Sequence, residues 1–320
     1  MVIRGFYKIR TQQSQCAAVS YDSAHQGSTA NEMKLPDSSH SRELRRFVLL
    51  TFTISWGVGL LFLLLRAYLE PKFGAFGPHN PFFYVAACAP TLAALILTFA
   101  ANGVPGVRAI LGTLVRIRLG WLGVAFLLLP AVGLTLILLA RVGTWIWPVR
   151  AHTILIELPI VLFLTPQLFT NTGALGEELG WRGYALPRLL EVRSAAAAAI
   201  ILGAIWTIWH VPAFFLSGVM TQSLGGFGWW ALDTFALSIV MAWLYLHSNG
   251  SVLIAGILPH FVINGMAAVG AWQSRPLEAI ALAFVAAAIL KFDAELWLRP
   301  NVRVAGSGEL LTDQSGKAIK

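Results

Sequence analysis

Charged residues and cysteines are both scarce in this sequence. Only 12% of the 320 residues are Asp, Glu, Lys or Arg, and 57% are hydrophobic, whereas soluble domains contain roughly one-quarter charged residues. The composition therefore predicts a membrane protein. Two cysteines, Cys16 and Cys88, are too few for a disulfide framework and argue against a cysteine-ligated metal site.

Several sequence signatures of other classes are also missing. No convincing Gly-x-Ser site with a histidine partner is present, which argues against a serine intramembrane protease. The HExxH signature of zinc helices is absent. No inverted repeat or broken-helix pair is visible, although a transporter would more often show one.

Long apolar runs account for most of the chain. A helix needs about 20 apolar residues to cross a bilayer, and the sequence contains about eight runs of that length. We therefore predict an all-α, polytopic helical membrane protein with about eight transmembrane helices. The predicted spans are 47–69, 82–102, 121–141, 153–171, 195–216, 227–247, 251–272 and 276–297.

The two ends of the chain differ from this apolar region. Residues 1–45 and 299–320 are polar, so we predict disordered tails around a transmembrane domain at 46–298. The first apolar run exceeds the core of a signal peptide and lacks a cleavage site behind it, so we expect it to stay as a span. The start site is open between Met1 and Met33.

The basic residues are distributed asymmetrically along the predicted spans. The formal charge is +8, but no basic face suggests nucleic acid. Lys and Arg gather in the amino-terminal tail, at 108–118, at 182–193 and in the carboxyl-terminal tail, so the positive-inside rule predicts that both tails are cytoplasmic and that the Glu177 region lies near the inner surface. Residues 103–120 form either an amphipathic interfacial helix or a basic loop.

Three clusters of polar residues occur inside or beside apolar runs, where charge is costly and often functional. They are Glu177, Glu178 and Arg182 in GALGEELGWRGYALPRL; Trp206 and His210 in WTIWHVPAFF; and His260 and Asn264 in LPHFVINGM. For the isolated residues Glu157, Asp233 and His247, we favour interfacial solvation over a functional role.

Helical spacing predicts how the first and third clusters are arranged. Glu178 and Arg182 are four residues apart and share a helix face, where a guanidinium can hold a carboxylate bidentately, whereas Glu177 points about 100° away. Glu177 is then a free carboxylate, and desolvation suits it to accept a proton near neutral pH. The alternative is a surface ion pair on an interfacial helix. His260 and Asn264 also share one face.

Prolines lie close to both histidines. Pro212 follows His210 by two residues, and Pro259 directly precedes His260. A proline inside a helix frees the carbonyl four residues earlier, so we expect kinks whose free carbonyls, at Ile208 and Ala255, line a wet cavity.

These residue types can be assembled into a hydrolase that activates water. A carboxylate can take a proton from water, and a histidine can hold that water. A second histidine with an asparagine can donate to the oxyanion that forms on a cleaved amide.

The same residues carry a family resemblance. EELGWR resembles the EExxxR motif, WTIWH the FxxxH motif and HFVIN the HxxxN motif of the CAAX protease and bacteriocin-processing (CPBP) family, also called Rce1-like or ABI intramembrane proteases. The motifs lie in the family's order within 170–270. Trp206 replaces the family's phenylalanine, from which we expect a changed pocket wall.

The resemblance implies an intramembrane endopeptidase with a cavity open to the cytoplasmic side. Glu177 and His210 would activate water, and His260 and Asn264 would stabilise the oxyanion. Glu178, Arg182 and Trp206 would support them. Substrates would be membrane-associated or CAAX-like peptides or proteins, and the sequence does not say whether they are prenylated.

Several alternatives stay open. The protein could be a non-catalytic immunity or scaffold protein, or a transporter with a Glu and His relay. We expect no required cofactor, but a zinc ion held by His210, His260 and Glu177 is the alternative, because the family includes members described as metalloproteases. The absence of prenylation and retention signals favours the inner membrane of a prokaryotic cell. The oligomeric state is undetermined.

Overall fold

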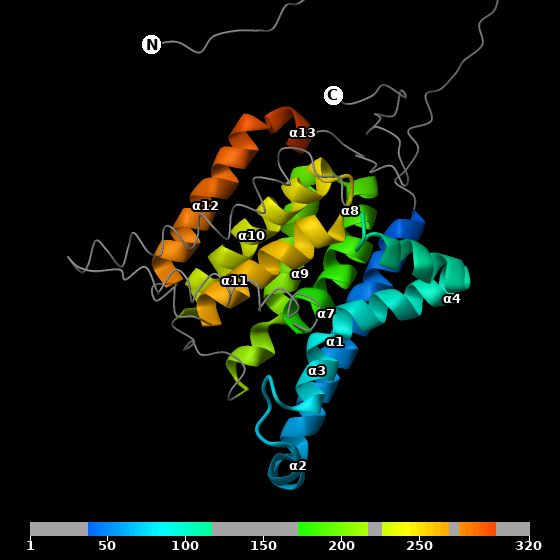
Figure 1. The fold of residues 1–320 in the computed structure, drawn as a ribbon, viewed down its shortest axis with the longest axis vertical. Helices are drawn as coiled ribbons and strands as arrows, with labels where there is room; N and C mark the ends of the chain where they lie inside the picture. The colour runs from blue at the N-terminus through cyan, green and yellow to red at the C-terminus, as the bar shows by residue number, and fades with distance from the viewer. Residues whose placement is uncertain (1–37, 117–171, 217–225, 269–274, 299–320) are drawn as a thin grey trace, which may run out of the picture. The chain divides into compact units, whose positions relative to one another are not determined.

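The computed structural model describes residues 38–116, 172–216, 226–268 and 275–298. All regular elements in these ranges are helices, which confirms the all-α prediction (Figure 1). The α-helices are α1 (Ser38–Leu64), α2 (Arg66–Phe73), α3 (Pro81–Ala87), α4 (Ala89–Gly112), α7 (Thr172–Gly180), α8 (Leu186–Val192), α9 (Ala195–Trp209), α10 (Phe227–His247), α11 (Leu258–Ala268), α12 (Arg275–Phe292) and α13 (Ala294–Leu298). Two π-helical turns, η2 (Trp181–Ala185) and η5 (Leu253–Ile257), and one 3₁₀ turn, η3 (Val211–Phe214), adjoin them.

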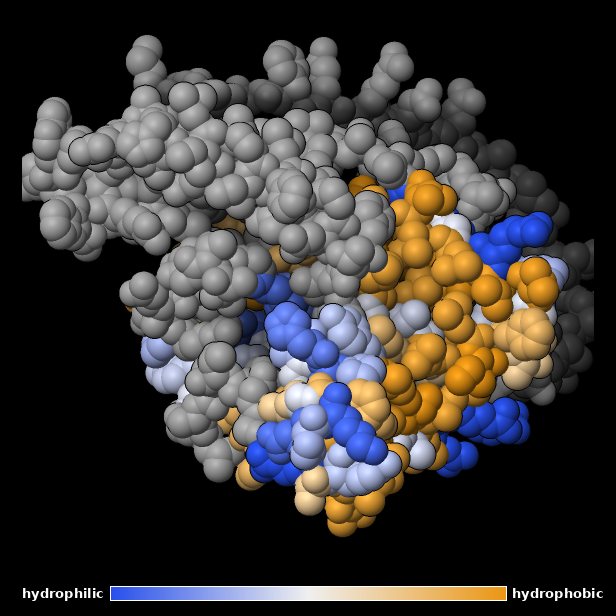
Figure 2. All heavy atoms as spheres, turned by 60° about the horizontal axis from the view of Figure 1, so that its bottom comes forward, coloured by the Kyte–Doolittle hydropathy of each residue, from blue (hydrophilic) through white to orange (hydrophobic). Residues whose placement is uncertain are grey.

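Within the ranges that the structure describes, four helices are long and apolar enough to cross a membrane. They comprise His40–Leu64, Ala89–Gly112, Ala195–Phe214 and Phe227–His247. Large side chains such as Leu64, Phe99 and Phe284 are exposed, and Figure 2 shows hydrophobic residues side by side over a broad area. Such a surface is suited to lipid, and the protein is an integral membrane protein.

Six of the predicted spans overlap helices of the structure, although the span 47–69 is interrupted at Leu65 and the span 82–102 at Cys88. The other two, 121–141 and 153–171, lie outside the described residues, as do Glu157, Cys16 and most of both predicted tails. The total of eight spans therefore stays a prediction.

The amino-terminal boundary differs from the prediction. Helix α1 begins at Ser38, so residues 38–45 are helical and do not belong to a disordered tail. Two side chains of this first part are paired with α8. His40 Nε2 lies 2.7 Å from Glu191 Oε2, and Glu43 Oε2 lies 2.7 Å from Arg188 Nε. Sequence composition could not reveal these contacts.

The segment after the first half of α4 is also helical. Gly103 has φ 59° and ψ −154°, a non-helical conformation at which the chain turns within α4. Residues 104–112 continue as helix beyond this break, so the basic-loop alternative is wrong for this stretch.

A small helix, α7, is held tightly between neighbours. In Figure 1 it lies between α4 on one side and α9 and α11 on the other. A Cβ atom on Gly180 would lie 2.4 Å from the backbone of Pro90, and one on Gly176 would lie 2.7 Å from Cys88 Sγ. These two glycines allow α7 to approach α4 closely and thereby fix the position of the carboxylates between them.

Both histidine-bearing segments depart from regular α-helix, although differently from the proline prediction. α9 ends at Trp209, and Pro212 lies in the following turn, η3. Pro212 therefore does not kink the helix that precedes His210. Pro259 lies directly after the π-helical turn η5, near the start of α11.

The predicted cavity beside the histidines stays a hypothesis. The structure does show a hollow among its described residues, and neither histidine lines it. Its lining residues are Phe62, Leu63, Arg66, Glu70, Phe76, Phe215 and Leu216.

Two isolated polar residues also have contrasting environments. Asp233 is only 4% exposed, so its interpretation as an interfacially solvated residue is wrong. His247 is exposed, and its Nε2 lies 3.2 Å from Asp293 Oδ2.

Candidate active site

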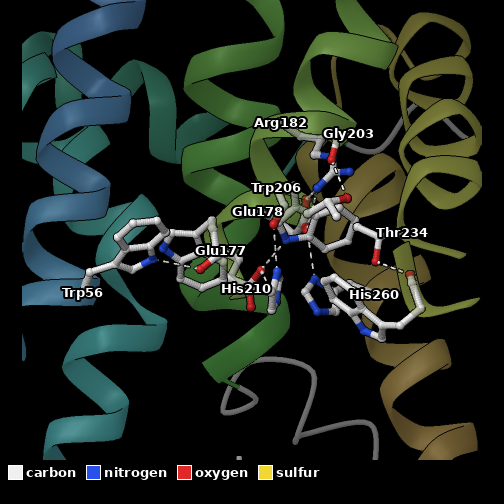
Figure 3. A network of polar contacts seen from close by, with 12 residues as sticks. Trp56, Glu177, Glu178, Arg182, Gly203, Trp206, His210, Thr234 and His260 are labelled. Atoms are coloured by element: carbon white, nitrogen blue, oxygen red, sulfur yellow. Dashed lines mark hydrogen bonds and ion pairs between the residues drawn. The ribbon is translucent and has the colours of Figure 1, made fainter. Parts of the chain in front are cut away.

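Three segments that are far apart in the sequence bring their polar side chains together in the membrane domain. α7 and η2 contribute Glu177, Glu178 and Arg182, the end of α9 contributes Trp206 and His210, and α11 contributes His260 (Figure 3). The juxtaposition predicted from the motifs is therefore present for these six residues. The seventh, Asn264, is half-buried one turn beyond His260 on α11.

Glu178 accepts hydrogen bonds from two of these side chains. Arg182 Nη1 donates to its Oε1 at 3.0 Å and to its Oε2 at 2.9 Å, and His260 Nδ1 lies 2.8 Å from Oε1. Glu178 and Arg182 are fully buried, which excludes the alternative of a surface ion pair. The pairing is the predicted one, but a single nitrogen makes both contacts to the carboxylate in place of a two-nitrogen fork.

Arg182 has further donors that its partner does not use. Its Nε and Nη2 atoms are buried and have no hydrogen-bond partner among the described residues, and its guanidinium lies 4.4 Å from the centre of the Trp206 ring. A cation over an aromatic face is attracted by the ring quadrupole. The indole therefore helps to stabilise the guanidinium charge of Arg182, in addition to the hydrogen bonds that Glu178 accepts from it.

Glu177 has a different environment from its neighbour. It is 4% exposed and accepts a hydrogen bond of 2.7 Å from Trp206 Nε1 at its Oε2. The same oxygen lies 4.0 Å from His210 Nε2, beyond hydrogen-bond distance. Glu177 is thus separate from the Glu178 pair, as predicted, but it is not free of partners.

His210 is oriented by its own helix and by aromatic rings. Its Nδ1 lies 2.9 Å from the carbonyl oxygen of Trp206, and its ring is 4.6 Å from that of Trp209 and 4.9 Å from that of Trp230. Because a carbonyl can only accept, Nδ1 carries a proton in this contact. In the neutral ring, Nε2 then presents its lone pair on the side of Glu177.

The hydrogen bond of His260 restricts what its other nitrogen can do. Nδ1 faces an ionised carboxylate oxygen, which only accepts, so Nδ1 carries a proton. Nε2 can then donate a hydrogen bond only when the ring is a doubly protonated imidazolium. A role as an oxyanion donor therefore requires the charged form of His260.

Two residues of the site were missed from the sequence. A Cβ atom on Gly256, in η5, would lie 2.8 Å from Glu178 Oε2, so only glycine lets this turn contact the carboxylate. Trp56 of α1 donates from Nε1 to the carbonyl of Trp209 at 3.0 Å. Neither residue belongs to a recognisable motif, and both act through contacts between distant segments.

The site also contains a group of side chains with the spacing of metal ligands. One ligand atom each of Glu177, Glu178 and His260 lie within 4.8 Å of one another. The predicted zinc alternative consists of His210, His260 and Glu177. These three are not among the described groups whose ligand atoms lie this close together. In the observed group, both Glu178 oxygens already accept hydrogen bonds from Arg182, so this carboxylate is poorly suited to a metal.

Comparisons with known proteins agree with the motifs. Residues 159–266 match the family model of the Rce1-like type II CAAX prenyl endopeptidase. A protein of Methanococcus maripaludis named CAAX prenyl protease 2 is 33% identical over 132 residues, which are 38% of this chain and 47% of that protein. The match thus spans about half the length of this relative. Both findings confirm the resemblance to the Rce1-like family.

Proposed function

We propose that this integral membrane protein is an intramembrane endopeptidase that hydrolyses peptide bonds with water activated by Glu177. The observation that carries this proposal is the arrangement of Glu177 Oε2 and His210 Nε2, 4.0 Å apart in a buried site. This separation is too long for a direct hydrogen bond but allows both atoms to contact one water. The carboxylate takes the proton of that water as it attacks the amide carbonyl.

His260 and Asn264 form the second part of the proposed site. The charge that develops on the carbonyl oxygen is stabilised by donors fixed in advance, each worth about 10²–10³ in rate. The imidazolium of His260 donates from Nε2, and the carboxamide of Asn264 donates one turn further along α11. Glu178 and Arg182 support this arrangement, because Glu178 fixes the orientation of the His260 ring.

The substrates proposed for this site are peptides or proteins at the membrane with a CAAX-like end. The name of the Methanococcus maripaludis relative supports this class. We also propose a location in the inner membrane of a prokaryotic cell, with both tails on the cytoplasmic side.

The function is tested with a Glu177→Gln variant in liposomes that contain candidate membrane peptides. We expect cleavage to fall by about 10²–10⁴-fold, with unchanged insertion and thermal stability. Glu70→Gln is the matched control, because Glu70 is paired with Arg66 on α2, far from the site. Wild-type immunity, transport or cleavage in Glu177→Gln would refute hydrolysis by this carboxylate.

A further inference from the structure

Beyond the residues that touch the water, we propose that Trp206 is a positioning residue whose indole N–H holds the carboxylate of Glu177. This inference rests on the proposed function of Glu177. It assigns to the tryptophan a polar role that differs from forming a pocket wall. Phenylalanine, the residue of the family motif at this place, could fill the space but could not donate.

The contact itself has the character of a charge-assisted hydrogen bond. Trp206 Nε1 and Glu177 Oε2 are 2.7 Å apart, at the short end of the range for N–H to carboxylate. Trp206 is 3% and Glu177 4% exposed, so bulk water does not replace this donor. A buried carboxylate without a donor is costly, and within the described part of the chain this is the hydrogen bond that Glu177 accepts.

The indole is held in place on its other sides. Arg182 lies 4.4 Å above its ring, and the ring of His260 lies 5.4 Å away. These neighbours restrict the rotation of the indole, so its N–H is fixed toward Glu177 before a substrate arrives.

The backbone of the same residue positions the other group that faces the water. The Trp206 carbonyl accepts from Nδ1 of His210 at 2.9 Å, which leaves Nε2 of His210 toward Glu177. Trp206 therefore orients the carboxylate through its side chain and the imidazole through its main chain. Oε2 of Glu177 accepts from the indole through one lone pair, and its second lone pair can face the water between Glu177 and His210.

A pair of tryptophan substitutions isolates the N–H group. Trp206→Phe keeps an aromatic ring and removes the donor to Glu177. Trp243→Phe is the matched control, because it also removes an indole N–H that donates to a carboxylate, Asp293 Oδ2 at 3.1 Å, away from the site residues. We expect Trp206→Phe to lower kcat by about 10- to 100-fold with KM within about twofold, and Trp243→Phe to change kcat by less than about threefold.

A spectroscopic measurement tests the contact independently of turnover. In protein labelled with ¹⁵N at tryptophan, the indole signal that is missing from Trp206→Phe belongs to Trp206. We expect this signal to move upfield in Glu177→Gln, because a neutral amide accepts more weakly than a carboxylate. If Trp206→Phe does not fold, the wild-type and Glu177→Gln spectra still show whether one indole signal responds.

The outcomes separate this inference from the proposed function. Full cleavage by Glu177→Gln would overturn both. Three results, each with an inactive Glu177→Gln, would overturn the inference alone. These are a wild-type kcat in Trp206→Phe, an equal loss of kcat in Trp243→Phe, and indole signals that do not shift in Glu177→Gln.

Discussion

Glu177 and Glu178 are adjacent in the chain and have different partners. Glu178 accepts from a guanidinium and an imidazole, whereas Glu177 accepts from an indole. On a helix, consecutive side chains point about 100° apart, and the two carboxylates consequently face different helices. Glu178 therefore holds the side chains of Arg182 and His260 in place, and Glu177 is the carboxylate that we propose reacts with water.

The pairing of Arg182 predicts a graded response to substitution. Arg182→Met removes the guanidinium and leaves buried Glu178 with His260 as its remaining side-chain partner among the described residues, which should destabilise the protein by about 3–5 kcal/mol. Arg182→Lys keeps the charge, and the single lysine nitrogen can contact both Glu178 oxygens as Nη1 of Arg182 does. It loses the planar group over the Trp206 ring, so we expect retained insertion but at least about tenfold lower activity.

Thermal unfolding in detergent and the cleavage assay measure these two effects. Arg188→Lys is the control, because Arg188 pairs with Glu43 in a partly exposed position, where such pairs contribute about 0–1 kcal/mol. Full activity of Arg182→Lys would mean that only the charge is needed, and wild-type stability of Arg182→Met would contradict the importance of the pair.

The same contacts bear on zinc. A catalytic zinc site needs about three protein ligands and an open position. With Glu178 committed to Arg182 and His260, the observed group leaves Glu177 and one nitrogen of His260. We expect that enzyme stripped with a chelator, and shown to be zinc-free by elemental analysis, keeps most of its Glu177-dependent cleavage.

A specific result would reverse this expectation. If cleavage were lost on stripping and returned with one equivalent of zinc, the metal would be required. Glu177 and His260 would then be candidate ligands, and the water would be activated by the metal.

At the scale of elements, two π-helical turns adjoin the site. η2 carries Arg182 directly after the carboxylates, and η5 carries Gly256 against Glu178. Such turns are uncommon and are found frequently at functional sites. Here they bring an arginine and a glycine backbone to one buried carboxylate from two segments.

The glycine of η5 gives a test of this close approach. In Gly256→Ala, the new methyl group would lie 2.8 Å from Glu178 Oε2 and 2.9 Å from its Cβ. The carboxylate must move, so we expect its contact with His260 to be disturbed and kcat to fall by at least about tenfold. The cleavage assay and thermal unfolding together measure the effect.

Gly228→Ala is the matched control for this change. No atom of the described neighbours lies within 4 Å of a Cβ atom at Gly228, so activity and stability should stay near wild type. Similar activity in both alanine variants would show that Glu178 tolerates displacement.

Apolar run length predicted the long helices, and four-residue spacing predicted the pairing of Glu178 with Arg182, because both are local properties. The runs did not mark α7 and α8, and the meeting of the three motifs was predicted from their residue types and the family resemblance. The sequence could not predict the bond from Trp206 to Glu177, the contact of Gly256 or the start of α1 at Ser38. Each of these depends on which segment packs beside which. The prolines were misleading for a related reason, since Pro212 lies beyond the end of a helix and not inside one.

At the scale of the whole domain, contacts along α1 show how far the site extends along this helix. Phe47, the first residue after Arg45 and Arg46, contacts the ring of Trp181, and Trp56 donates to the carbonyl of Trp209, the neighbour of His210. Nine residues of helix rise about 14 Å, roughly half of a 30 Å hydrocarbon core. The location of the Glu177 region near the inner surface stays a prediction.

The orientation of the domain is tested by labelling single cysteines in a background without Cys16 and Cys88. With cytoplasmic tails, Ser307→Cys should react with a membrane-impermeant maleimide only after lysis. Lys72→Cys, in α2, should react in intact cells, because the positive-inside rule puts it on the other side. Labelling of Ser307→Cys in intact cells would invert the topology.

The extent of the site along α1 sets a minimum reach for the proposed substrates. An extended peptide advances about 3.3 Å per residue, so covering about 14 Å takes about four residues. Under the proposed function, we expect a chain end that enters beside Phe47 to extend over that many residues before its scissile bond meets the water beside His210. A folded or shorter end would not reach this water, so we propose that substrate length and unfolding act as a gate before any side chain is recognised.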